Sequence, residues 1–167
     1  MTYADYLANA TRLAVEVANT GTAGDPGSIP RQMLDDHQVA PATAASLGPL
    51  RTVLRQALEQ IVTGGQADAV GTMLKRYPPD MHLSGHDGIP HIHFARDGLP
   101  PQRWIGQTTA AALAHVVTGD PGVTLGRCAA SGCDRFFVDQ SRNRTRRFCG
   151  SSCASCTEAP TMPIKTW

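Results

Sequence analysis

The sequence predicts an α+β fold that is mainly helical, with a small antiparallel β-hairpin in its body and a short cysteine-rich module near the C-terminal end. Apolar residues recur at helical spacing through most of the body, one segment alternates apolar and polar residues, and all five cysteines lie in 128–156. A chain of 167 residues can build one globular core, but so short a module cannot fold unaided. We therefore expect a body at 1–122, a module at 123–156 and an irregular tail at 157–167.

Four amphipathic helices are expected in the body. The first spans Tyr3–Asn19 and ends at Asn-Thr-Gly, and the most regular lies within 41–62, where Leu and Ile form one apolar stripe before a Gly-Gly pair. A shorter helix over 67–77 ends at the prolines of 78–79, and a last helix over 102–118 follows the prolines of 100–101. The stretch 20–30 is rich in Gly, Thr and Pro, so we expect a loop there.

The alternating segments, Met81–Ser84 and His91–Phe94, are typical of two short strands joined by a turn. Asp87-Gly88 between them favours a two-residue hairpin connection. Pairing about that turn predicts these cross-strand partners: Met81 with Phe94, His82 with His93, and Leu83 with Ile92. One face of the hairpin should therefore be apolar, and the other should carry histidines.

The histidine face is a candidate ligand-binding surface. If a helix covers it, the face becomes a polar pocket; otherwise the histidines are exposed or satisfy buried hydrogen bonds. The indole of Trp104 can stack on a ligand, or it can complete the core beside Ile105. The candidate ligand-binding residues are His82, His91, His93 and Trp104.

The cysteines form two short pairs, Cys128-x4-Cys133 and Cys149-x3-Cys153, separated by fifteen residues. Zn²⁺ prefers four such ligands in a tetrahedron, and two knuckles flanking a hairpin-sized insertion supply them in a treble-clef or ribbon-like zinc finger. Within the insertion we expect a strand at 136–138, a turn at 141–143 and a returning strand at 146–148, and we expect a helix to open at Cys149.

This pattern predicts one structural zinc ion bound by Cys128, Cys133, Cys149 and Cys153. Free or disulfide-bonded cysteines are the alternative, and iron–sulfur clusters usually follow other spacings. A catalytic zinc is disfavoured because four cysteines leave no position open for water. Cys156 is either an alternate ligand or a spare thiol.

The module is also basic. Residues 127–147 contain six arginines and two aspartates, a local charge of +4, so the remainder of the chain carries −3 of a total of +1. The candidate DNA-binding residues are Arg142, Arg144, Arg146 and Arg147. The same cluster can instead be a solvated face of the module or a surface for another protein.

Membrane and enzyme classes find little support. No run approaches the ~20 apolar residues that span a bilayer, and the first residues lack the basic region of a signal peptide, so a cytoplasmic location is expected. HExxH, nucleophile-elbow and phosphate-loop motifs are absent, and we expect no catalytic residues. The spacings His82-x3-His86 and His91-x-His93, with Asp87 nearby, are the weak argument for a metallohydrolase. An apolar helical body can also form a homodimer, although no heptad repeat supports one.

At the level of whole segments, the sequence resembles a known family. The stretch 127–144, RCAASGCDRFFVDQSRNR, continued by RFC at 147–149, resembles the zinc finger of bacterial CGNR proteins that carry an N-terminal ABATE domain. The stretch 13–20, LAVEVANT, is similar to the end of that family's first helix. The resemblance implies a stress-induced transcriptional regulator, with a body that senses a small ligand and a finger that binds DNA.

The chain departs from the family after its last predicted ligand. Where the family continues as Cys-Gly-Asn-Arg into a basic helix, this chain has Cys153-Ala-Ser-Cys156, followed by Pro160 and Pro163, which stop a helix. The basic residues of that helix are missing. This departure favours an alternative function, a zinc-stabilised ligand-binding or protein-interaction protein that does not bind DNA.

Overall fold

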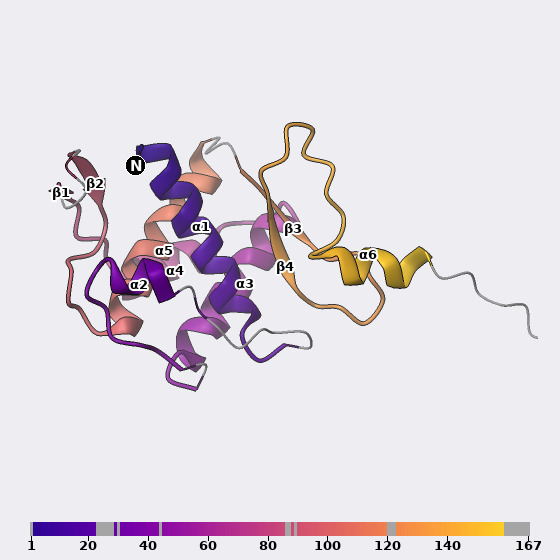
Figure 1. Ribbon diagram of the computed structural model, residues 1–167, viewed down its shortest axis with the longest axis horizontal. Helices are drawn as coiled ribbons and strands as arrows, with labels where there is room; N and C mark the ends of the chain where they lie inside the picture. The colour runs from indigo at the N-terminus through magenta and orange to yellow at the C-terminus, as the bar shows by residue number, and fades with distance from the viewer. Residues whose placement is uncertain are drawn as a thin grey trace, which may run out of the picture.

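The computed structural model describes residues 2–22, 29, 31–43, 45–85, 88, 90–119 and 123–158. The fold is mainly helical with two small antiparallel hairpins, so the predicted fold class is confirmed (Figure 1). In chain order the elements are α1 (Tyr3–Asn19), α2 (Arg31–Asp35), α3 (Gly48–Val62), α4 (Asp68–Arg76), β1 (His82–Ser84), β2 (His91–His93), α5 (Pro101–Thr118), β3 (Thr124–Arg127), β4 (Phe136–Asp139) and α6 (Ser151–Glu158). The short helix α2 was not expected from the sequence.

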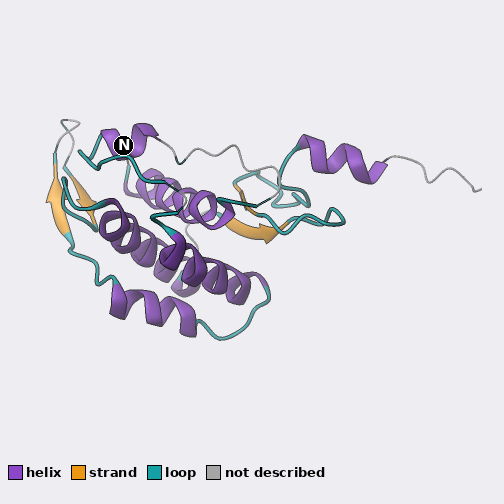
Figure 2. Cartoon of the chain, turned by 90° about the horizontal axis from the view of Figure 1, so that it is seen from below, coloured by secondary structure: helices purple, strands orange, loops and turns teal. Residues whose placement is uncertain are grey.

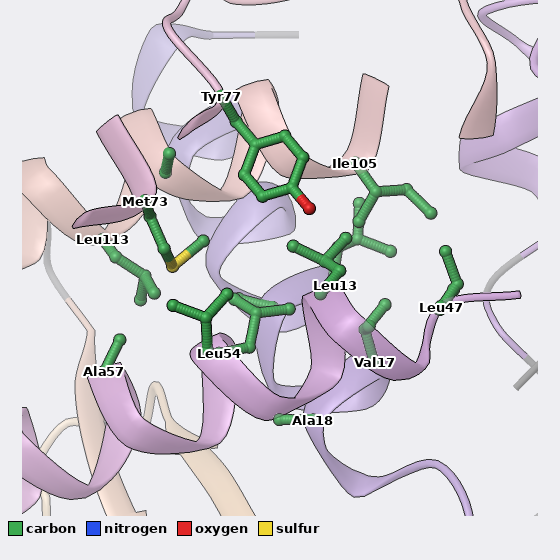
Figure 3. Packing of buried hydrophobic residues seen from close by; sticks show 14 of the residues in the cluster. Leu13, Val17, Ala18, Leu47, Leu54, Ala57, Met73, Tyr77, Ile105 and Leu113 are labelled. Atoms are coloured by element: carbon green, nitrogen blue, oxygen red, sulfur yellow. The ribbon is translucent and has the colours of Figure 1, made fainter. Parts of the chain in front are cut away.

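The body is built on α1, which lies against both α3 and α5, while α4 packs on α3 and α5 (Figure 2). The apolar stripe predicted for α3 is the face that it buries, and Leu54 and Ala57 point toward side chains of α1 and α4 (Figure 3). Trp104 and Ile105 of α5 are completely buried in the same core. Aliphatic side chains fill most of this interior, and aromatic residues make up 5% of the chain.

Local sequence features explain where several of the helices begin or end. Thr2 caps α1: its hydroxyl accepts a hydrogen bond from the Asp5 N–H at 3.1 Å, and the Asp5 carboxylate accepts one from the Thr2 N–H at 3.0 Å. Prolines stand in the first turns of α3 and α5, where a missing N–H costs no helical bond. Helix α4 ends at Arg76, just before the prolines that were expected to end it.

The β1–β2 hairpin has the predicted register, with His82 opposite His93 and Leu83 opposite Ile92. Met81 and Phe94 lie just beyond the paired residues, and Asp87 lies outside the described residues; Gly88 has a φ of +80°. The histidine face is turned toward the helices, whereas Leu83 on the apolar face is 74% exposed. The structure thus resolves which face is covered.

The expected partner of the second hairpin was wrong. Strand β4 is present as predicted, but it pairs with β3, and residues 146–148 form no strand. Leu125 of β3 and Val138 of β4 pack against the core of the body, so the β3–β4 pairing also buries apolar surface. The returning segment is held instead by side-chain hydrogen bonds, described below.

The hairpin of the cysteine module is fixed to the body through α1 and α3. Phe136 is 2% exposed and belongs to the main core, and the Asn19 side chain pairs with its backbone as a neighbouring strand would. The Asn19 amide donates to the Phe136 carbonyl and accepts from the Phe136 N–H, both at 2.9 Å. Arg127 bonds Glu59 of α3 at 3.1 Å. The module and the body therefore share a core.

Within the described residues, no helix combines the length and the apolar character that crossing a bilayer requires.

Candidate metal centre

The four cysteines predicted to bind zinc come together in the module of β3, β4 and α6. That module lies on the opposite side of the molecule from the β1–β2 hairpin (Figure 1). Their sulfur atoms all lie within 4.8 Å of one another. Cys149 Sγ lies 3.8 Å from Cys133 Sγ and 3.6 Å from Cys153 Sγ. A tetrahedral zinc ion with Zn–S bonds of about 2.3 Å holds its sulfur ligands about 3.8 Å apart. The cluster can therefore hold a metal ion, and its geometry is consistent with zinc.

The first pair of cysteines lies on the turn between β3 and β4. The N–H of Cys128 donates to the Arg135 carbonyl at 2.9 Å, which continues the pairing of the strands by one step. Gly132 has a φ of +76°, a left-handed conformation that costs glycine little, and the following residue, Cys133, donates its N–H to the Ala130 carbonyl at 3.1 Å. This tight turn brings both sulfurs to one side.

The second pair lies at the start of α6. Cys149 precedes the helix, which begins at Ser151 rather than at Cys149, and Cys153 lies in its first turn. The N–H of Cys149 donates to Cys128 Sγ at 3.3 Å, so the two pairs are joined by a backbone hydrogen bond to a sulfur. The side chain of Cys156 lies outside the described residues.

The sulfurs differ in how readily each loses its proton. Burial raises the pKa of the Cys128 thiol, but hydrogen bonds from the N–H groups of Ala130 and Cys149 and from the thiols of Cys133 and Cys149 outweigh that effect and lower the pKa to about 7. Burial, together with the neighbouring sulfurs, raises the pKa of Cys149 to about 12. Thiols this close cannot all ionise unless a cation compensates their charge. A bound zinc ion would supply that charge, and the thiol protons would be released on binding.

The loop after β4 is held by Asp139 and Arg146. Asp139 is 3% exposed, and its carboxylate accepts hydrogen bonds from the N–H groups of Ser141 at 2.9 Å and Arg146 at 2.8 Å. Bonds from Ser141 and from the Arg146 backbone hold the pKa of Asp139 below its usual range. The Arg146 guanidinium donates to the carbonyls of Val138, Phe148 and Cys149. These two side chains replace the ladder that the expected returning strand would have made.

The predicted DNA-binding arginines occupy two kinds of position. Arg146 directs its guanidinium into the module and stacks over Phe137, with 5.1 Å between the guanidinium carbon and the ring centroid. Arg142, Arg144 and Arg147 are exposed, on a loop whose residues from 140 to 147 are all exposed. All four arginines are thus at the surface, but the Arg146 guanidinium is engaged by the module itself and shapes the loop that carries the other three.

The predicted ligand-binding residues lie at the other end of the body. His93 is fully buried, with its ring stacked on Tyr6 of α1 at 4.8 Å between centroids. His91 Nε2 lies 2.7 Å from His93 Nε2, and His82 Nδ1 lies 2.9 Å from the Asp80 carbonyl oxygen. A helix therefore covers the histidine face, and aromatic rings pack directly on it.

Two further residues of this cluster were missed by the sequence analysis. The ring centroid of His37 lies 4.7 Å from that of His93 and 4.8 Å from that of Trp104. His37 Nδ1 is 3.0 Å from Asp97 Oδ1. Both residues are on connecting segments, sixty positions apart, and no short spacing relates them to the hairpin. Among the described residues, ligand atoms of His37, His93 and Asp97 form the second group close enough to hold a metal ion.

Comparison with known proteins supports the identification of the cysteine module. Residues 124–161 match the family described as CGNR zinc finger. The search of curated proteins finds no match for this chain. The match covers the two strands, all four clustered cysteines and α6, and so confirms the resemblance for that segment. The C-terminal part of the chain is a zinc-finger module similar to the CGNR family.

Proposed function

We propose that this protein is a cytoplasmic zinc-finger transcriptional regulator, in which the arginine-rich module contacts DNA and an ABATE-like body responds to a small ligand, as in stress-induced regulators. The observation that carries the proposal is the exposed group Arg142, Arg144 and Arg147 beside the cysteine cluster. Guanidinium groups pair with phosphate oxygens through parallel hydrogen bonds, and such contacts supply most of the salt-dependent affinity for DNA.

The loop is held in place before any partner arrives, which supports binding. Asp139 fastens its two ends, and the Arg146 guanidinium fixes the segment that leads into Cys149. Because the loop is already ordered, binding a partner costs less conformational entropy than it would for an unanchored loop of the same charge. Phosphate contacts of this kind position a protein on DNA without reading sequence.

The body is connected to the module through groups able to transmit a change in either direction. The Asn19 amide joins the end of α1 to β4, and Arg55 of α3 donates to both the carbonyl and the carboxylate of Asp134, at 3.0 and 3.1 Å. A ligand that shifts α1 or α3 would therefore move the base of the finger. His82, His91, His93 and Trp104 remain the candidate ligand-binding residues.

A fluorescence anisotropy titration tests DNA binding. The zinc-loaded protein is added to a labelled duplex at about 50 mM and about 200 mM salt. We expect a Kd of about 10⁻⁴ to 10⁻⁶ M for sequence-independent binding, and each phosphate contact removed should reduce the salt slope by about 0.9. Changing Arg142 and Arg147 to Gln should weaken binding and reduce the slope by about 2.

The matched control changes two exposed arginines of the body, Arg31 and Arg103, to Gln and so alters the net charge equally. This control should bind DNA like the wild-type protein. If both double variants lose the same DNA affinity, the effect comes from net charge alone. If the wild-type protein does not bind the duplex at the lower salt concentration, the DNA-binding function is excluded.

One observation favours a second function. Helix α6, with the sequence SSCASCTE, contains no lysine or arginine, so the helix that carries the last clustered cysteine offers no cationic side chain for phosphate contacts. A zinc-stabilised ligand-binding or protein-interaction protein needs no such residues. In that case the anisotropy titration shows no binding while zinc remains bound.

A further inference from the structure

We propose that His37, His93 and Asp97 form a second metal site, which binds a divalent transition-metal ion at the end of the body opposite the cysteine cluster. Their ligand atoms lie within 4.8 Å of one another, although they come from three separate segments of the chain. Two imidazoles and one carboxylate are a ligand set that suits Zn²⁺, Co²⁺ and Fe²⁺, and three protein ligands leave a further coordination position open. The proposal does not depend on DNA binding by the finger.

The two imidazoles are buried among rings. His37 is 2% exposed and His93 is completely buried. The Tyr6 ring stacks on His93, and the Trp104 ring packs against His37. Burying polar rings is costly unless they gain strong partners. A metal ion bound to these buried rings would be largely shielded from water, which would strengthen its bonds to the imidazoles.

The residues around the proposed ligands hold them in position. His91 is hydrogen-bonded to His93 through their Nε2 atoms, at 2.7 Å, and so fixes the orientation of that ring. The Gly98 N–H donates to the His37 carbonyl at 3.0 Å, and this bond keeps the turn that carries Asp97 against His37. Orientation of a ligand by a hydrogen-bonded neighbour is usual around protein metal ions.

An ion can reach the site from solvent through its carboxylate. The Asp97 side chain is 35% exposed, whereas that of His37 is 3% exposed. Asp97 already lies 3.0 Å from His37 Nδ1, so an ion entering there would replace a hydrogen bond between two of its own ligands.

Cobalt titration of the full-length protein tests the proposal. The cysteine site is first filled with one equivalent of Zn²⁺, which Co²⁺ does not readily displace because it binds more weakly. Added Co²⁺ should then bind as one further equivalent, with visible d–d absorption but no thiolate-to-metal charge-transfer band. The absence of that band assigns the ion to nitrogen and oxygen ligands.

Two variants and a matched control complete the experiment. In D97N the amide oxygen can still accept a hydrogen bond from His37, so the fold should persist while Co²⁺ affinity falls at least tenfold; H37N should show the same loss. His115→Asn removes a histidine outside the cluster, one bonded to Tyr3 at 2.8 Å, and should leave Co²⁺ binding unchanged. Circular dichroism establishes that each variant is folded.

Two results would overturn the proposal. One is the absence of a second equivalent in the wild-type protein. The other is a second equivalent whose affinity is the same in D97N, H37N and the wild-type protein.

Discussion

The cysteine cluster and the histidine cluster lie at opposite ends of one molecule and are stabilised in different ways. The cysteine sulfurs come from one short stretch of chain, and they cannot all ionise unless a cation compensates their charge. The histidines come from distant segments, are enclosed by the body, and are linked by hydrogen bonds to one another and to Asp97. The comparison shows that neighbouring positions in the chain build one cluster, whereas the folded body brings the residues of the other together.

The largest effect should follow from removing a cysteine ligand. In Cys149→Ser the module should lose its metal, with a change approaching the ~10–16 kcal/mol by which structural zinc is held in small fingers. The body should stay folded, because its helices share a core that needs no ion. Chelator competition measures the first effect, and amide NMR spectra measure the second. Well-dispersed signals from the cysteine turns and α6 without metal would contradict the account.

Removing the amide that links the two regions should have the next largest effect. Asn19→Ala leaves the buried N–H and carbonyl of Phe136 without their partners, which we expect to cost about 2–5 kcal/mol. Urea unfolding of the zinc-loaded protein measures it, and Asn143→Ala, on the exposed loop, is the control. If both variants unfold at the same urea concentration, the link carries no stability.

Two glycines offer a comparison of packing in the two regions. A Cβ at Gly126 would lie 2.5 Å from the Phe137 ring in the module, and one at Gly106 would lie 2.5 Å from the Tyr77 ring in the body. Alanine at either position should destabilise by about 1–3 kcal/mol through overpacking, and less at Gly106, where about 1 kcal/mol of helix propensity is regained. Gly71→Ala, in open space on α4, should stabilise. Thermal unfolding tests this order, and a stabilising Gly126→Ala would contradict it.

The smallest effect should come from the cap of α1. Hydrogen bonds from Thr2 lower the pKa of Asp5, so this carboxylate contributes stability at neutral pH that is lost as the pH falls through its folded-state pKa. Asp5→Asn should therefore lower the melting temperature slightly at pH 7, and the difference from wild type should disappear below about pH 3. A difference that persists in acid would assign the effect to something other than the charge.

The features that the sequence predicted correctly are those that depend on short stretches of chain. Spacing within a short segment predicted the cysteine cluster, and helical periodicity with proline and glycine stops predicted the main helices. The turn signal likewise predicted the register of His82 against His93. Each of these features is local in the chain.

The features that were not predicted depend on tertiary contacts. Strand β4 pairs with β3 because that hairpin buries Leu125 and Val138 on the body, a gain that the module's own sequence does not reveal. The association of His37 with Asp97 similarly requires the folded body, since these residues belong to unrelated connecting segments. The sequence also did not show that the histidine face is covered, because α1 packs on it only in the folded body.

The most direct test of the zinc finger is a cobalt titration of freshly reduced, metal-free protein. The account predicts a charge-transfer band from thiolate to metal that grows with the first equivalent of Co²⁺ and disappears when Zn²⁺ is added. A first equivalent that produces no such band, or reduced protein that binds no ion at all, would contradict it.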